Sequence, residues 1–218
     1  MSDSLRATRI PIRTRILTSQ DDLVQVVREY CGRIIRPGDI IALSESVVAI
    51  MQGRAIRADQ VKAGLLARFM CRFPAKHGSL ATPAAMQLAI NEVGALRILL
   101  GAAAAALGRL VGRRGDFYRV AGPELKLIDD IAGTLPPFDD CIVLGPKNPA
   151  KMAQELQEAL GVGVAIVDVN DLGCVDILGA SAGLDRELVQ RLLRDNPGGN
   201  DDQQTPIVIL RPGCTPEA

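Results

Sequence analysis

The run Val162–Val169 constrains the fold of this chain more than any other stretch. Its sequence, VGVAIVDV, is almost continuously apolar, which is typical of a strand buried on both faces. A helix opens directly before it, with Pro149 at the first position and Gly161 at the end. Ile40–Ser44 predicts a second buried strand. Because strands and helices intermix without a regular strand–helix–strand order, we expect an α+β fold, or irregular α/β, of mixed sheets with packed helices.

The 218 residues show neither an internal repeat nor a linker that separates two domains. Hydrophobic residues make up 48% and charged residues 23%, a composition typical of a globular chain. We therefore expect one domain over residues 9–212, with flexible ends at residues 1–8 and 213–218. The N-terminal sequence lacks the apolar core of a secretory signal and the five cysteines form no CxxC pair, so we expect a cytoplasmic protein with reduced thiols.

Charge and aromatic content argue against several classes of binding protein. Lysine and arginine total 25, and aspartate and glutamate total 25, so the net charge is zero. A neutral chain has no general attraction to nucleic acid or to an anionic membrane, and 3% aromatic residues supply few faces for base stacking. The single histidine excludes zinc sites that need two or more. We expect neither a nucleic-acid nor a membrane partner.

Residues 82–111 predict one long helix with Thr82 as its N-cap. Its most apolar part, Ile98–Gly108, rises only about 16 Å as a helix, roughly half of a bilayer core, so we expect a buried helix and not a membrane span. One face of this part carries small residues: Gly101, Ala105 and Gly108. They fit tight packing inside the core or, alternatively, contact between two copies of the chain. Beyond this helix, Gly115–Val120 predicts a strand.

Two acidic groups follow apolar segments, where active-site loops often lie. Asp129 and Asp130 come after a short apolar piece, and paired carboxylates suit Mg²⁺ or Mn²⁺, although solvated turn residues have the same pattern. The second group surrounds the turn after the buried strand: Asp168, Asn170, Asp171 and Asp176. It resembles the start of an EF-hand loop, but Leu172 stands where a ligand is required, so calcium is not expected. A structural turn and a site for another metal both stay open there.

Polar residues near other apolar segments are candidates for ligand binding. Ser44, Glu45 and Ser46 interrupt an apolar stretch at the end of a predicted strand, where they can face a site. Arg119 lies next to apolar Val120, and its guanidinium matches phosphate or carboxylate. With one histidine in the chain, no nucleophile–base pair can be argued, so we name no catalytic residue.

Three stretches carry a resemblance to a known family. They are IRPGDIIALSESVVAIMQGRAI at 35–56, IDDIAGTLPPFDDCIVLGPKNPAKMAQELQEALG at 128–161, and VAIVDVNDLGCVDILGAS at 164–181. In order and spacing, over most of residues 9–212, the chain resembles the coenzyme F-420 gamma-glutamyl ligase family. The resemblance implies an intertwined homodimer of mixed α/β type. It also implies a ligase that uses GTP to phosphorylate a carboxylate on a deazaflavin precursor, after which the amino group of L-glutamate attacks the acyl phosphate, with Mg²⁺ or Mn²⁺ holding the nucleotide.

The resemblance places metal ligands at Asp129 and at Asn170 with Asp171, and the adjacent Asp130 is the second carboxylate of the pair at 129–130. It departs from the family pattern at Asn170, where an aspartate is expected, which removes a charge from a site for a hard cation.

The family segment Gly-Arg-Pro-Trp-Arg is absent, and Glu45–Ser46 and Ala49–Ile50 stand where two lysines are expected. Three hypotheses follow: a GTP- and metal-dependent ligase acting on a small carboxylate substrate, a divergent relative that binds a nucleotide or small ligand without ligation, and a structural homodimer.

Overall fold

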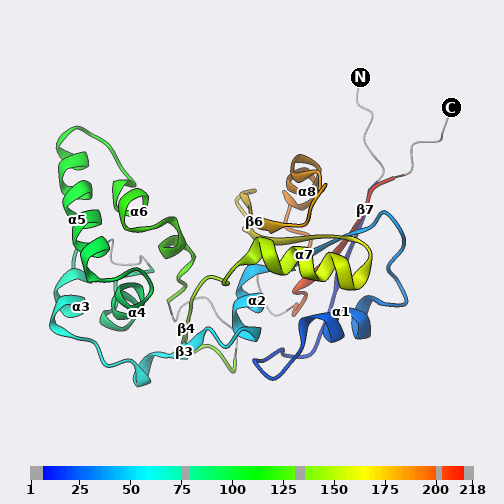
Figure 1. The fold of residues 1–218 in the computed structure, drawn as a ribbon, viewed down its shortest axis with the longest axis horizontal. Coiled ribbons are helices and arrows are strands. Elements are labelled where there is room, and N and C mark those ends of the chain that lie inside the picture. The colour runs from blue at the N-terminus through cyan, green and yellow to red at the C-terminus, as the bar shows by residue number, and fades with distance from the viewer. Residues whose placement is uncertain (1–6, 75–78, 131–135, 200–202, 214–218) are drawn as a thin grey trace. The chain divides into compact units, whose positions relative to one another are not determined.

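The computed structural model describes residues 7–74, 79–130, 136–199 and 203–213. The chain divides into two compact units: unit 1 comprises Met1–Gly53 and Pro146–Ala218, and unit 2 comprises Arg54–Gly145. Figure 1 shows the elements of both. The expected single domain over 9–212 stays a prediction, because compactness does not tell whether either unit folds without the other. Most of the predicted flexible ends, 1–8 and 213–218, lie outside the described residues, and the first strand already begins at Thr8.

Unit 1 is built on a five-stranded sheet with the strand order β1-β7-β2-β5-β6. Its strands are β1 (Thr8–Ile12), β2 (Ile40–Ser44), β5 (Gly163–Val169), β6 (Val175–Ala180) and β7 (Ile207–Arg211). The central pair, β2 and β5, runs parallel, and the other three pairs are antiparallel. The prediction of an α+β fold with a mixed sheet is confirmed.

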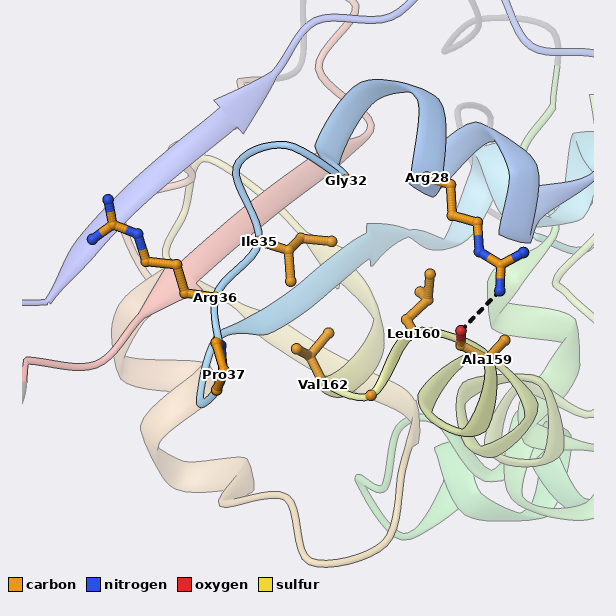
Figure 2. A pocket seen from close by; sticks show the side chains of 9 residues that line it. Arg28, Gly32, Ile35, Arg36, Pro37, Ala159, Leu160 and Val162 are labelled. Carbon is orange, nitrogen blue, oxygen red and sulfur yellow. Dashed lines mark hydrogen bonds between the residues drawn. The ribbon is translucent and has the colours of Figure 1, made fainter.

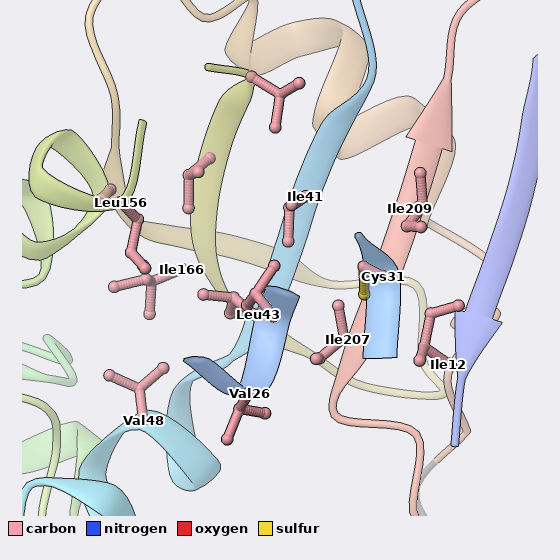
Figure 3. Packing of buried hydrophobic residues seen from close by; sticks show 14 of the residues in the cluster. Ile12, Val26, Cys31, Ile41, Leu43, Val48, Leu156, Ile166, Ile207 and Ile209 are labelled. Atoms are coloured by element: carbon pink, nitrogen blue, oxygen red, sulfur yellow. The ribbon is translucent and has the colours of Figure 1, made fainter. Parts of the chain in front are cut away.

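Helices cover both faces of this sheet. The helices of unit 1 are α1 (Leu23–Cys31), α2 (Glu45–Met51), α7 (Pro149–Leu160) and α8 (Arg186–Leu193). On one face, α1, α2 and α7 pack against Ile41, Leu43 and Ile166 (Figure 3). On the other, α8 packs against the alternate residues Ala42 and Val167. Strand β5 is therefore apolar at successive positions over residues 164–167, because helices cover both of its faces there.

A buried ion pair joins Arg211, the last residue of β7, to Asp39, the residue before β2. Asp39 is only 2% exposed. The Arg211 guanidinium donates from Nε to Asp39 Oδ1 and from Nη2 to Oδ2, both at 2.8 Å, and Nη2 also donates to the Ile34 carbonyl at 2.9 Å. Burial by itself raises the pKa of Asp39, but the hydrogen bonds from Arg211 and from the backbone N–H of Arg36 outweigh it and hold the pKa below its ordinary value.

Unit 2 is mainly helical. Its helices are α3 (Leu65–Met70), α4 (Pro83–Val93), α5 (Ala95–Leu110) and α6 (Asp116–Ala121), with short 3₁₀ turns η1 (Ala58–Gln60) and η2 (Pro123–Leu127). The first and last parts of the unit pair as a two-stranded antiparallel sheet of β3 (Ala55–Arg57) and β4 (Cys141–Val143). Among the described residues no single helix is long and apolar enough to span a membrane; α4 and α5 meet the length and composition criteria only as a pair bent by 110°.

Two sequence predictions in unit 2 are wrong. The long helix predicted over 82–111 is two helices, because Gly94 adopts a positive φ of 86° that the helix cannot continue through. The strand predicted over Gly115–Val120 is helix α6. Phe117 and Tyr118 are adjacent and both half-buried, a pattern that fits one side of a short helix packed on α5 better than a strand with alternating faces.

The small residues of α5 pack within the unit. A Cβ atom on Gly101 would lie 2.7 Å from the Ala121 Cβ, and one on Gly108 would lie 2.1 Å from Asp116 Oδ2. Both glycines therefore allow α5 and α6 to approach closely, as the core-packing interpretation expects. The homodimer itself stays a prediction.

Arg54 joins the two ends of unit 2. Its buried guanidinium donates from Nε to the Gly145 carbonyl at 2.6 Å and from Nη2 to Glu92 Oε2 at 2.8 Å. Its own carbonyl accepts from the Leu144 N–H at 3.1 Å. The side chain of Arg54, the first residue of the unit, is thus bonded to the last residue and to α4.

We expect Asp39→Asn to lower the free energy of unfolding by about 3 kcal/mol, because it leaves Arg211 without its buried counter-charge. Since the folded pKa of Asp39 is depressed, its contribution is complete above the ordinary value of about 4 and is lost as the pH falls through the folded pKa. Urea unfolding from neutral to acidic pH should therefore show wild type and variant converging at low pH. Glu155→Gln, which breaks the exposed pair with Lys151, is the control and should cost less than about 1 kcal/mol. Equal losses for the two variants would contradict the assignment.

We expect Arg54→Met to destabilise the chain by about 3 kcal/mol, because it removes a buried charge and two partners together. The matched control is Arg57→Met, whose exposed guanidinium pairs with Asp59 and Asp140 and should contribute less than about 1 kcal/mol. Chemical denaturation measures both losses, and limited proteolysis should show the additional cleavage sites of the Arg54 variant inside residues 54–145. Cleavage confined to unit 1 would contradict this role.

Candidate functional site

The carboxyl ends of the parallel strands β2 and β5 lie next to each other. The register pairs Ser44 with Val167, so the residues that follow each strand emerge at the same edge of the sheet. In open sheets this is the edge at which ligands bind, because the chain leaves it through loops and helix starts. Polar residues of unit 1 follow both strands at this edge: Ser44, Glu45 and Ser46 after β2, and Asp168 near the end of β5.

At the end of β2, three polar residues turn the chain into α2. Ser44 is half-buried and its N–H donates to the Pro206 carbonyl at 2.9 Å. Glu45, the first residue of α2, is only 5% exposed, and Ser46 Oγ donates to Glu45 Oε1 at 3.4 Å. The expected strand-end position of these residues is confirmed. Their contact with a nucleotide stays a prediction.

At the end of β5, two carboxylates stand opposite each other. The register of the antiparallel β5–β6 pair places Asp168 directly across from Asp176. Burial raises the pKa of Asp168, and the neighbouring Asp176 carboxylate raises it further. Like charges directly opposite in a sheet are destabilising, so this pair costs stability unless something positive lies between the carboxylates.

Helix α8 holds the β6 side of this pair in place. Gln190 Nε2 donates to the Val175 carbonyl at 3.2 Å, and Arg186 Nη1 donates to the Ile177 carbonyl at 3.5 Å. These two carbonyls flank Asp176 on an edge strand. Two outward-facing carbonyls of the edge strand β6 thus have side-chain partners on α8, and the backbone on both sides of Asp176 is held in place.

Asn170 shapes the turn between β5 and β6. Its Oδ1 accepts from the N–H groups of Leu172 and Cys174, each at 3.0 Å. The adjacent Asp171 accepts from Asn196 Nδ2 at 2.7 Å, which attaches the turn to the segment after α8. Both residues therefore have structural roles in the hairpin, in line with the turn interpretation, while their roles as metal ligands are untested predictions.

The remaining predicted site residues lie in unit 2. Asp129 forms an isolated β-bridge with Val143, with backbone hydrogen bonds of 2.8 and 3.0 Å, and Asp130 follows it half-buried. Arg119 lies on α6 and donates to the buried Asp116 carboxylate at 2.7 Å. Its guanidinium is therefore already engaged within the helix, one turn from its partner.

The predicted metal ligands are divided between the units, with Asp129 and Asp130 in unit 2 and Asn170 and Asp171 in unit 1. Within the described residues, no group of three or more His, Cys, Asp or Glu is arranged to hold a metal ion. What unit 1 does bring together is the Asp168–Asp176 pair. A sequence signal for it exists: a hairpin with its turn centred on Leu172 makes residues 168 and 176 mirror positions.

A cavity of about 330 Å³ lies at the other end of the parallel strands, before β2 and β5 begin. Figure 2 shows it between the loop that precedes β2 and the segment that precedes β5. Arg28 Nη2 donates to the Ala159 carbonyl there, at 3.0 Å. Since α1 and α7 both end at this cavity, the arginine satisfies a helix C-terminus. The cavity thus lies at the amino ends of the parallel strands, away from the acidic pair.

We expect Asp168→Asn to raise the free energy of unfolding at neutral pH by up to about 1 kcal/mol, because it removes a like-charge cross-strand pair. Since the folded pKa of Asp168 is raised, wild type is penalised above the ordinary value of about 4, and the gain of the variant should vanish at lower pH. Asp176→Asn should show the same dependence in urea unfolding. A stability loss at neutral pH in both variants would show that the pair is not repulsive.

Comparison with known proteins adds one finding. Residues 11–106 match the family described as F420-0:Gamma-glutamyl ligase. The matched part includes β2, the Ser44–Ser46 turn and unit 2 through most of α5, so the resemblance recognised from the sequence is confirmed there. The acidic residues at 129–130 and 168–176 lie outside it. No curated protein matches the chain.

Proposed function

Because residues 11–106 match the F420-0:gamma-glutamyl ligase family, we propose that the chain is a gamma-glutamyl-ligase-like enzyme that forms an amide bond between a carboxylate and L-glutamate. The observation that supports a reaction site in unit 1 is the pair of opposed carboxylates, Asp168 and Asp176. They lie near the strand ends from which the Ser44–Ser46 turn also emerges. The proposed site is thus contained in unit 1.

The proposed reaction has two steps. The acceptor carboxylate attacks the γ-phosphorus of GTP, forming an acyl phosphate and releasing GDP. The neutral amino group of L-glutamate then attacks the acyl carbon, the C–O bond to phosphate breaks, and the products are the amide, inorganic phosphate and a proton. A deazaflavin precursor is the acceptor that the family suggests.

The acidic pair fits a divalent cation that arrives with the nucleotide. Mg²⁺ is commonly held by one or two carboxylates together with substrate phosphates, so a three-residue protein cluster is not required. Asp168 and Asp176 would hold such an ion, and their mutual repulsion is what a cation relieves. When bound, Mg²⁺ or Mn²⁺ neutralises charge on the phosphate oxygens.

The β2–α2 turn supplies hydrogen-bond donors for the same ligand. The hydroxyl groups of Ser44 and Ser46 flank Glu45 at the strand end, and both residues are half-buried. Serine hydroxyls donate to phosphate oxygens without adding charge. Since Glu45–Ser46 stands where the family carries a lysine, the proposed site depends more on the cation for charge neutralisation.

We expect the purified full chain, supplied with GTP, L-glutamate, the deazaflavin precursor and Mn²⁺, to release GDP together with a product one glutamyl residue heavier. Asp168→Asn should reduce this rate by about a hundredfold, because it removes a carboxylate from the proposed cation site while the hairpin is retained. Asp59→Asn, which changes an exposed carboxylate of unit 2 paired with Arg57 on β3, is the matched control and should leave the rate unchanged. Chromatography of nucleotides and mass spectrometry of the acceptor measure both products.

Thermal unfolding separates the remaining hypotheses. A ligand at a hundred times its dissociation constant stabilises by about 2.7 kcal/mol, which is roughly 5–11 °C for a chain of this size. A shift that needs GTP and Mn²⁺ together, without GDP release, would assign the chain to the non-ligating relative that binds a nucleotide. Neither shift nor product, with a dimer in sedimentation experiments, would overturn the proposal in favour of the structural homodimer.

A further inference from the structure

We draw no further inference here: the strongest candidate, the cavity of about 330 Å³ where α1 and α7 end, carries nothing because its Arg28 guanidinium already donates to the Ala159 carbonyl and nothing in the part of the chain that the structure describes shows which ligand the cavity takes.

Discussion

The parallel pairing of β2 with β5 is the constraint on which unit 1 depends. These two strands lie far apart in the sequence, and both are covered by helices on either face. The hydrophobic effect stabilises this arrangement because the apolar side chains of residues 40–43 and 164–167 leave water. The same pairing sets the ends of both strands at one edge, where Ser44 and Asp168 emerge. Position and stability of the proposed site therefore have a single origin.

The acidic pair illustrates a conflict between stability and function. A cross-strand pair of carboxylates is unfavourable in the protein alone even where, as here, both residues are exposed, and the pKa of Asp168 is raised accordingly. Helix α8 and the Asn170 turn fix the hairpin so that Asp168 and Asp176 cannot move apart easily. Strain of this kind is common at sites that bind a ligand of opposite charge, because the ligand restores the balance.

The two units differ in secondary structure, charge and exposed surface. Unit 1 holds the five-stranded sheet, the polar strand ends and most of the acidic residues, whereas unit 2 has an excess of basic residues and exposed leucines on α5. The family match covers parts of both units, and it includes Arg54 with its partner Glu92 but not Gly145.

Periodicity and glycine or proline signals were enough to place most elements. The helix that begins at Pro149, the strand that follows it and the final strand near Ile207 all occur close to where the sequence predicts them. Two predictions failed for identifiable reasons. Gly94 breaks an otherwise continuous helical pattern, and the short α6 has too few residues to show a helical period that exceeds a strand-like one.

The sequence by itself determined the class of fold, the burial of the central strands and the family resemblance, because these depend on local pattern and residue order. Only the tertiary structure decided which polar groups meet. It assigned Asn170 to a turn and Arg119 to Asp116, and it set Asp168 opposite Asp176. It also showed that α6 covers the glycine side of α5, whereas five leucines of the same helix remain exposed. Pairings between distant segments depend on strand register and helix packing, which no local pattern specifies.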